Sequence, residues 1–597
     1  MNSGSDVRPL TAFNPPQEKV ETLKMNTGFT ALVGLAIVAL LGANAPASAW
    51  TPPIGIPDPG FGITDTIPAR THYVDNSGTC DDSNNGGLGS PAAPRCTIPT
   101  TLAAGASVEV HGGPYLYQGS CPDAFVANGT VQSRVYVWGV ISGGNKPVIQ
   151  GDRIHSGTCF QPNGTYYVVD GFRFSNGTTL VVIARGSYGV IRNSEFVNYQ
   201  PQADAQGRQY GEVLTAVGDH FVFYNNVFRD NGNYLSTVDN KVQGIKIGGL
   251  AGTVGTGYVW ILNNIFYHNG QGMQHGDDCV GTIVNGLCQP DIAAFPHHFY
   301  IGYNVIHDDR EVGIALKMVH DFVISQNEVY NYKDLPAGAD CANSPIPTAL
   351  NIGRYASDKV WVLFNKVHDS VIGIRSNGND EGYTGPTPVF PSVYLIGNVV
   401  TDIHGSTSTT GANCVPYGAI DPYSGGAAIL GWNNYRLYVV NNTIAHSDKG
   451  ISLTSVGYYE VTGNLVTSTG DLMNFVPANW GTNKYDYNFY DGTARLAYGS
   501  TTPIISLANV QSYGQETHSR QGSALLDSNY RPMSGSPVVD VGVRSAVYDT
   551  FFSLYGINIA KDIQGRTRPQ GAAWDIGAYE LGGTVGSLPA PSGLVVR

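Results

Sequence analysis

Three basic residues, Lys317, Arg354 and Arg375, lie at or near the ends of three successive apolar segments that read IALK, ALNIGR and GIRSNG. If these segments form neighbouring parallel strands, Lys317 and Arg375 lie on one wall about 10 Å apart, with Arg354 between them. A polymer lying along the stack of strands would then meet all three cations. The two guanidinium groups would also lower the pKa of the Lys317 amine by like-charge repulsion, which favours a general base.

An asparagine-led repeat predicts which way these side chains point. Asn304, Asn327 and Asn365 each open a unit of two apolar or β-branched positions, a turn and a short strand. Side chains alternate between the two faces of a strand. One face is expected to hold Ile314, Leu350 and Ile374, and the other face Ala315, Asn351 and Arg375.

The same asparagine position recurs along much of the chain, and its shortest steps are 22 and 23 residues. That period suits one coil of three short strands, and longer steps indicate loops inserted into the same scaffold. A buried turn leaves backbone groups unpaired, and a side-chain amide supplies both a donor and an acceptor. The sequence therefore predicts an all-β fold, a parallel β-helix. The position is held by Ser194, Asn226, Asn264, Asn304, Asn327, Asn365, Asn398, Asn442 and Asn464.

The two ends of the predicted stack resemble those of secreted bacterial right-handed parallel β-helix proteins. The matching segments are THYVDNSGTCDDSNNGG with GASVEVHGGPY at one end, and GSPVVDVGV with DIQGRTRPQGAAWDIGAYEL at the other. The resemblance implies a right-handed solenoid over residues 71–500 with an N-terminal cap. It also implies a C-terminal closing module over 501–582, which we expect to cover the open end of the stack. Residues 50–70 are predicted to form an extended lead, and residues 583–597 a linker-like tail.

Residues 304–377 resemble the alginate lyase and chondroitinase B group of polysaccharide lyases. In that group a Lys ends one strand, an Arg ends the next, and a Gly-Ile-Arg strand follows. The resemblance implies β-elimination in a uronate-containing glycan, with Lys317 as base and cationic charge stabilising the enolate. Arg354 would neutralise the carboxylate or help to protonate the departing oxygen, and Arg375 is the third catalytic candidate. This chain departs from the group in having Gly353 at the strand register expected for the arginine, and Met318 where a Ser is usual.

The same resemblance implies Ca²⁺ held by acidic residues just before the lysine, where Asp308, Asp309 and Glu311 stand. Their spacing differs by one residue from that of the group. Asp308 also shares its coil position with Asp230, Asp369 and Asp402, and Asp residues in phase are typical of turn capping, so both interpretations stay open. The candidate substrate-binding residues on the same wall are Lys246, Gln274, His275, Asn351 and Asn377.

A second constellation, QHGDDC, contains the adjacent carboxylates Asp277 and Asp278. They could serve as acid and base of an inverting glycoside hydrolase, which needs carboxyl groups about 6.5–9.5 Å apart. Gly276–Cys279 is similar to one motif of the polygalacturonases, whose other motifs are missing here. A further alternative is a non-catalytic glycan-binding or adhesive surface protein, because a fold does not by itself fix a function.

Composition and the N-terminal segment restrict partners and location. The formal net charge of −13 argues against a nucleic acid or an anionic membrane as a general partner. Residues 31–41 are apolar but too short to span a bilayer, and Ala47 and Ala49 fit a cleavage site before Trp50, so residues 1–49 are predicted to be a signal peptide. No other stretch is long enough for a membrane span. We expect a secreted monomer whose partner is a polysaccharide.

The chain has eight cysteines, and in an exported protein these favour disulfides. Local spacing suggests the pairs Cys80–Cys96 and Cys279–Cys288. Elimination then leaves Cys121–Cys159 and Cys341–Cys414.

Overall fold

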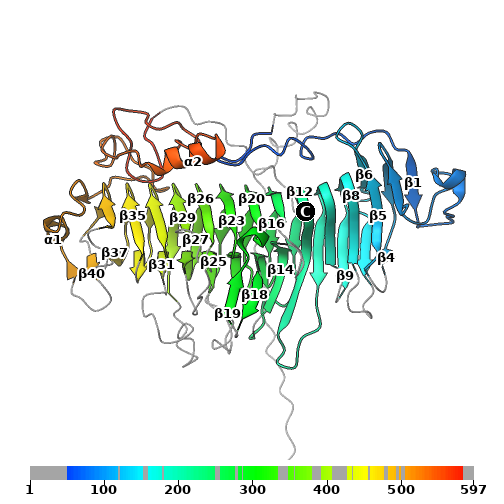
Figure 1. Cartoon of the computed structure of the whole chain (residues 1–597), viewed down its shortest axis with the longest axis horizontal. Coiled ribbons are helices and arrows are strands. Elements are labelled where there is room, and N and C mark those ends of the chain that lie inside the picture. The colour runs from blue at the N-terminus through cyan, green and yellow to red at the C-terminus, as the bar shows by residue number, and fades with distance from the viewer. Residues whose placement is uncertain are drawn as a thin grey trace, which may run out of the picture. The chain divides into compact units, whose positions relative to one another are not determined.

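The regular structure of this chain is almost entirely parallel β-strand (Figure 1). The computed structural model describes residues 50–117, 121–151, 159–177, 181–238, 240–248, 256–275, 280–284, 287–333, 347–354, 357–378, 391–405, 426–432, 434–454, 457–475, 482–492, 496–498 and 504–582.

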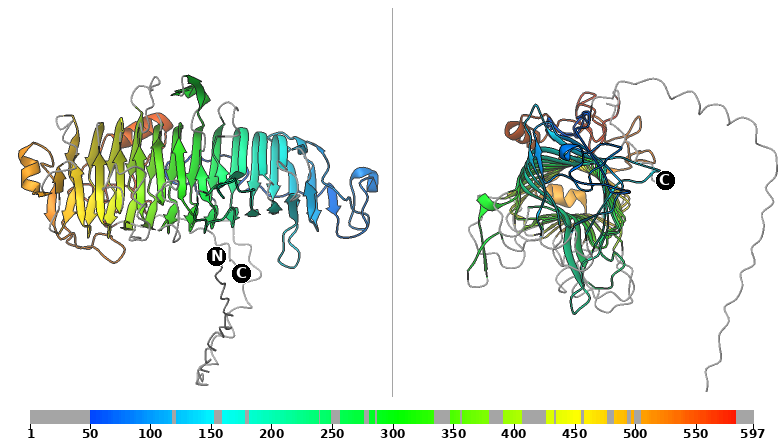
Figure 2. Two further views of the ribbon diagram at one scale, coloured as in Figure 1. Left: turned by 90° about the horizontal axis from the view of Figure 1, so that it is seen from below. Right: turned by 90° about the vertical axis from the view of Figure 1, so that its right-hand side faces the viewer.

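One coil consists of three strands that run in sequence around the stack. In a central coil these are β15 (Gly257–Leu262), β16 (Ile265–Tyr267) and β17 (Gln271–Gln274). They pair in parallel with the corresponding strands of the next coil, β20 (His297–Gly302), β21 (Val305–His307) and β22 (Val312–Lys317). This pairing, repeated along the chain, confirms the predicted right-handed parallel β-helix, since parallel crossovers take the right-handed form. Figure 2 shows the coils end-on.

The strands fall into three faces. Face 1 holds β1 (His72–Asp75), β3 (Ser107–His111), β6 (Val135–Gly139), the second halves of β8 (Cys159–Asp170), β10 (Val181–Arg192) and β12 (Gln209–Tyr224), β15, β20, β23 (His320–Ser325), β26 (Asp358–Leu363), β29 (Ser392–Ile396), β32 (Arg436–Val440), β35 (Tyr458–Thr462) and β38 (Lys484–Asp486). Face 2 holds β4 (Tyr115–Tyr117), β7 (Val148–Gly151), β9 (Arg173–Gly177), β11 (Glu195–Tyr199), β13 (Val227–Arg229), β16, β21, β24 (Glu328–Tyr330), β27 (Lys366–Ser370), β30 (Val399–Ile403), β33 (Thr443–Ala445), β36 (Leu465–Thr467), β39 (Phe489–Asp491) and β42 (Arg520–Gly522). Face 3 holds β2 (Thr101–Ala103), β5 (Asp123–Asn128), the first halves of β8, β10 and β12, β14 (Asn240–Lys246), β17, β22, β25 (Thr348–Arg354), β28 (Ile372–Asn377), β31 (Ala427–Trp432), β34 (Lys449–Thr454), β37 (Asp471–Phe475) and β40 (Leu496–Tyr498).

The interior of the stack is apolar, and its side chains repeat from coil to coil. Phe174, Phe196, Phe228 and Phe266 stack on one another with ring centroids 4.5–4.8 Å apart, which is the spacing of the coils. A buried amide ladder runs beside this core, where face 1 turns into face 2. The side-chain oxygen of Asn365, for example, accepts from the backbone nitrogen of Asn327 at 2.9 Å and from its side-chain nitrogen at 3.0 Å.

All nine ladder positions expected from the sequence are occupied as predicted, from Ser194 to Asn464. The sequence interpretation missed one more member, Asn488, whose side-chain oxygen accepts from the backbone nitrogen of Asn464 at 2.9 Å. The ladder ends at Ser519 and the buried carboxylate of Glu516, which accept from Asn488.

Two of the four expected disulfides join described residues. Cys80–Cys96 closes the N-terminal cap beside the short 3-10 helix η1 (Asn84–Gly87), and Cys121–Cys159 joins the chain before β5 to the start of β8. In both pairs the Cα atoms are 5.0 Å apart. Cys279, Cys341 and Cys414 lie outside the described residues, and so do the predicted signal peptide and the tail from residue 583.

The outer side of face 1 is covered by the lead and by part of the C-terminal module, which lie along the same edge of the stack in Figure 1. The Trp260 indole donates to the carbonyl oxygen of Pro57 at 2.8 Å, and the Ser325 hydroxyl donates to that of Ile54 at 2.6 Å. Helix α2 (Val547–Tyr555) packs Phe551 against Trp361 of β26. The lead and the C-terminal module therefore bury apolar side chains on the outer side of face 1.

The C-terminal module differs in part from the expected end cap. Helix α1 (Leu507–Ser512) does close the last coil, with Leu507 and Val510 packed into the interior core. Strand β41 (Ile504–Ile505) pairs antiparallel with β40 just before it. The remainder turns back along the flank, where the Gly577 nitrogen donates to the carbonyl oxygen of Gly463 at 2.8 Å. The motif that resembled a closing module thus covers the side of the stack, because apolar side chains there also need burial.

Replacing Asn365 by alanine is expected to lower the free energy of unfolding by about 3 kcal/mol, because several buried backbone and side-chain groups lose their partners at once. Its amide nitrogen donates to the carbonyl oxygen of Ile324 at 2.9 Å and to Asn398 at 3.0 Å. Chemical denaturation followed by circular dichroism measures the change. Asn529→Ala, at an exposed asparagine, is the matched control. Equal effects of the two substitutions would contradict the role assigned to the ladder.

Candidate functional site

The outer side of face 3 carries the predicted row of polar side chains. Strand pairing aligns Lys246 with Gln274, Gln274 with Ala315, Ala315 with Asn351, and Asn351 with Arg375. This register is as predicted from the sequence. The residues before them, including Ile314, Leu350 and Ile374, lie in the interior core, so the polar row points outward. We call the outer side of face 3 from β14 to β31, which includes this row, the polar wall.

A local irregularity brings Lys317 and Arg354 opposite each other. Between Ala315 and Lys317 the register of β22 against β25 shifts, because β25 contains one extra residue there. Gly353 supplies the bulge with a φ of +76°, a left-handed conformation that glycine adopts without strain. The sequence has Gly353 at the register where the lyase group has an arginine. The bulge explains this difference, because the extra residue moves Arg354 opposite Lys317. Lys317 pairs with Arg354 in the sheet; the side chain of Arg354 lies outside the described part.

Arg375 is held in place by two neighbours. Its Nε donates to the side-chain oxygen of Asn377 at 2.8 Å, and its guanidinium carbon lies 5.6 Å from the centroid of the Trp432 ring. Asn377 and Trp432 are strand partners on β28 and β31. Sequence reasoning missed Trp432, although its position one strand further along the same register was a usable signal. An indole beside a cation is a common surface for the apolar side of a sugar ring.

Two side-chain oxygens of the polar wall are buried without a hydrogen-bond partner among the described residues, Oε1 of Gln274 and Oδ1 of Asn351. Gln274 is only 6% exposed. A buried acceptor without a donor costs free energy, so these two amides are held in place against a local cost. Lys246 lies at the end of the row, half-buried. A binding role for Gln274, Asn351 and Lys246 stays a prediction.

His275 supports the wall from within. The imidazole is 1% exposed, and its Nδ1 donates to the backbone oxygen of Lys317. The ring therefore holds the end of β22 in place, and little of its surface faces outward. The sequence interpretation took it for a substrate-binding residue, and the observed contact indicates a positioning residue.

Asp309, one of the three expected calcium ligands, lies inside the stack. It continues a second, shorter amide ladder formed by Asn231 and Asn269. One carboxylate oxygen accepts from the backbone and side-chain nitrogens of Asn269, both at 2.8 Å, and the other accepts from the Tyr332 hydroxyl at 2.9 Å. Burial raises the pKa of this carboxyl to about 7.

Glu311 is buried too, in an ion pair with Arg310 at 2.5 Å. It also accepts from the Gln271 side chain at 2.6 Å and from the backbone nitrogen of Asn240 at 3.1 Å. Arg310 in turn donates to the backbone oxygen of Ser236 at 2.8 Å. The pair therefore fastens Ser236 and Asn240 to the stack, and Asn240 is the first residue of β14, the strand that carries Lys246.

Asp308 occupies the outer turn with a φ of +53°, and Asp230, Asp369 and Asp402 share this left-handed conformation at the same coil position. Its carboxylate contacts His307 and Asn331. The three acidic residues do not converge, and no group of three or more His, Cys, Asp or Glu side chains suited to a metal ion occurs in the described part of the chain. They do not fit a Ca²⁺ site as they stand, and calcium binding stays a prediction.

Asp277 and Asp278, the candidate carboxylates of a hydrolase, lie outside the described residues. They precede a two-stranded antiparallel hairpin of β18 (Gly281–Val284) and β19 (Leu287–Pro290). A 3-10 helix, η2 (Ile292–Ala294), then leads into β20. Within the described residues no helix is long and apolar enough to cross a membrane.

Comparison with known proteins gives fold-level likeness only. No family model matches the chain, and no curated protein matches its sequence. Among solved structures, the pectate lyase Pel9A is 14% identical with a TM-score of 0.35, covering 86% of this chain and 96% of its own. The PL6 family alginate lyase AlyGC is 13% identical with a TM-score of 0.40, covering 72% and 52%. The surface adhesin PfbA of Streptococcus pneumoniae is 12% identical with a TM-score of 0.35, covering 67% and 87%. None of these likenesses is close enough to indicate an activity.

Asp309→Asn is expected to make thermal stability less dependent on pH. The folded chain holds the Asp309 proton more tightly than the unfolded chain, because the pKa rises from 3.8 to about 7. The associated stability is therefore complete below about pH 4 and is lost as the pH rises through about 7. Asparagine cannot ionise, and it matches Asn231 and Asn269 in the same ladder.

Melting temperatures measured from about pH 5 to 8 should fall less in the variant than in the parent protein. The buried Glu516, whose pKa is also raised to about 7 by burial, contributes equally to both and cancels in the difference. Parallel curves for the two proteins would show that Asp309 does not titrate in this range.

Proposed function

We propose that this chain is a secreted glycan-acting enzyme that cleaves a uronate-containing glycan by β-elimination at the polar wall. The observation that carries the proposal is the bulge at Gly353, which pairs Lys317 with Arg354 on neighbouring strands. Arg375 follows on the next strand, two strands from Lys317 or about 10 Å away. A base flanked by two permanent cations suits the removal of a proton next to a carboxylate.

In the proposed reaction Lys317, as the neutral amine, takes the proton from C5 of the uronate, the carbon α to the carboxylate. The electron pair left behind forms the C4=C5 double bond, and the C4–O glycosidic bond breaks. The departing oxygen takes a proton, from Lys317 or from water, so the products are an unsaturated uronate and a new hydroxyl end. Arg354 and Arg375 counter the negative charge that grows on the carboxylate as the enolate forms. No step involves a metal ion.

The rest of the wall supplies features that a sugar polymer needs. The row also holds the amide side chains of Gln274 and Asn351, a group type that pairs with sugar hydroxyls. The ring of Trp432 beside Arg375 offers an apolar surface next to a charge. The chain has a net charge of −13, so attraction for an acidic glycan must come from this local group of cations.

Export is supported by the disulfides. Cys80–Cys96 and Cys121–Cys159 are formed in the described part of the chain, and such bonds persist in oxidising compartments. We propose that residues 1–49 act as the signal peptide and that the mature chain begins at Trp50.

The first test is incubation with alginate, pectate and glycosaminoglycans, followed by the ultraviolet absorbance of the new C4=C5 double bond. Lys317→Arg keeps the positive charge but cannot give up its proton at neutral pH, so turnover should fall by about 10²–10⁴-fold while substrate binding is retained. Lys366→Ala, at an exposed lysine on face 2, is the matched control and should leave turnover unchanged. Full turnover by Lys317→Arg would rule out Lys317 as the base.

The hydrolase alternative is tested with the double variant Asp277→Asn and Asp278→Asn. If the chain is a lyase, both carboxylates are dispensable, and the double variant should lower the rate less than about 10-fold, within the range of one weak interaction. Reducing ends that form without the ultraviolet signal, and that disappear in this variant, would instead establish an inverting hydrolase. Binding to a glycan without any cleavage product would establish the non-catalytic alternative.

A further inference from the structure

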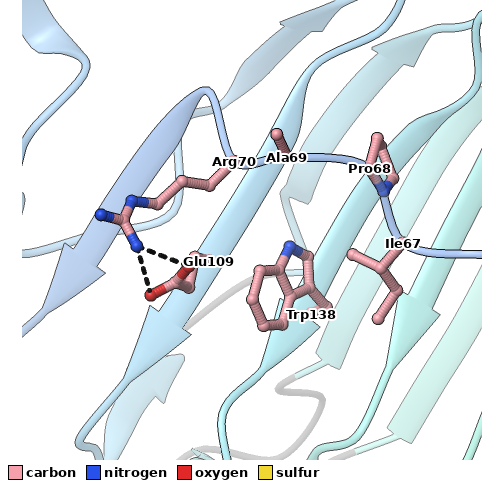
Figure 3. A pocket seen from close by; sticks show the side chains of 6 residues that line it. All are labelled: Ile67, Pro68, Ala69, Arg70, Glu109 and Trp138. Atoms are coloured by element: carbon pink, nitrogen blue, oxygen red, sulfur yellow. Dashed lines mark hydrogen bonds and ion pairs between the residues drawn. The ribbon is translucent and has the colours of Figure 1, made fainter.

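We propose a second glycan site on face 1, separate from the polar wall, which takes a neutral pyranose unit on the indole of Trp138. A pocket of 600 Å³ lies there, within the usual range of about 300–1,000 Å³ for small-ligand sites. Figure 3 shows the six residues that line it. They are Ile67, Pro68, Ala69 and Arg70 of the lead, Glu109 of β3 and Trp138 of β6.

The floor of the pocket is set by strand register. Glu109 and Trp138 are direct partners on β3 and β6, and both point to the outer side of face 1, since Val108, Val110 and Val137 beside them lie in the core. The Trp138 Nε1 donates to the Ser107 hydroxyl at 3.2 Å, which fixes the orientation of the ring. In Figure 3 the indole lies between the Glu109 carboxylate and the Ile67 side chain with a ring face toward the viewer.

The lead builds the opposite wall and is itself anchored. The backbone nitrogen of Thr71 donates to the carbonyl oxygen of Ser107 at 2.8 Å, and the Ser107 hydroxyl donates to that of Pro68 at 3.2 Å. Ser107 thus holds both the lead and the indole, so the two walls keep a fixed separation. A preformed pocket binds with a smaller entropic cost than one that must be ordered by its ligand.

The polar groups of the pocket suit hydroxyls. Arg70 pairs with Glu109 through Nη1 at 3.1 Å, and His111 contacts the other carboxylate oxygen at 2.8 Å. Within the described residues Nε and Nη2 of Arg70 make no hydrogen bond, and its side chain is 45% exposed. The pocket therefore presents free donors, a carboxylate acceptor and an aromatic face.

Charge separates this site from the polar wall. The guanidinium of Arg70 and the carboxylate of Glu109 cancel, so the pocket has no net attraction for a carboxylated sugar. The wall, in contrast, carries Lys317, Arg354 and Arg375 on another face and in later coils. An apolar platform with balanced charges favours a neutral pyranose, whose C–H groups stack on the indole while its hydroxyls meet Arg70 and Glu109. The inference does not rest on β-elimination at the wall.

The test uses the full chain with Lys317→Arg, for which we expect turnover about 10²–10⁴-fold slower, and measures binding by calorimetry. The probes are cellohexaose, xylohexaose and mannohexaose, with trigalacturonate as the acidic comparison. At least one neutral probe should bind, and Trp138→Ala should weaken that binding by about 10-fold or more while Trp138→Phe retains most of it. Phe552→Ala, at an exposed aromatic residue of α2 outside both sites, should leave it unchanged, and Trp432→Ala reports any binding at the polar wall.

The inference is wrong if no neutral probe binds, or if Trp138→Ala binds the neutral probe as tightly as the parent does. It is also wrong if Trp432→Ala weakens neutral binding as much as Trp138→Ala does. The fourth contrary result is that Trp138→Ala changes only the binding of trigalacturonate. Melting temperatures of all variants exclude loss of the fold as the cause. The ultraviolet assay on the parent protein reports the wall alone, so a failure of either proposal can be distinguished from a failure of the other.

Discussion

The buried amide ladder is the constraint on which the rest of this structure depends. At each turn from face 1 to face 2 the backbone bends inside the protein, away from water, and would lose hydrogen bonds that the strands elsewhere provide. One asparagine per coil supplies them: its oxygen accepts from the coil before, and its nitrogen donates to the coil after, as at Asn304 and Asn327. Because every link uses both ends of the amide, one displaced coil would leave two neighbours unsatisfied. The register of neighbouring coils at this turn is therefore fixed from Ser194 to Asn488.

Because the register is fixed, residues at the same coil position lie next to each other in space, however far apart they are in the sequence. Loops of very different length separate β17, β22, β25 and β28, yet their outward residues stay aligned from Lys246 to Arg375. In coils that precede the ladder, parallel strand pairing likewise places Glu109 beside Trp138 on face 1. Both candidate sites are thus rows across strands, and a polymer is the ligand shape that such rows accommodate.

Features that repeat with every coil could be predicted from the sequence. The burial of individual side chains and the path of irregular segments could not. The ladder from Ser194 to Asn464 and the outward row were predicted because amide turns and strand alternation repeat. Asp309 and Glu311 were misplaced because a carboxylate looks the same in sequence whether it faces water or replaces an asparagine inside the stack. The path of the lead over Trp260 was not predicted, because a Pro/Gly-rich segment has no period that indicates where it packs.

The two register shifts among the described strand pairs differ in what accompanies them. The shift in β5, at Asp123–Phe125, lies two residues from the Cys121–Cys159 disulfide, which ties the start of β8 to the chain before β5. The shift in β25 has no disulfide beside it in the described part of the chain, and Gly353 there is closed in by Val393 and Ser376. A bulge that interrupts regular strand pairing without stabilising the stack acts on the placement of side chains. Its visible effect is to bring Arg354 into register with Lys317, the pair on which the proposed reaction depends.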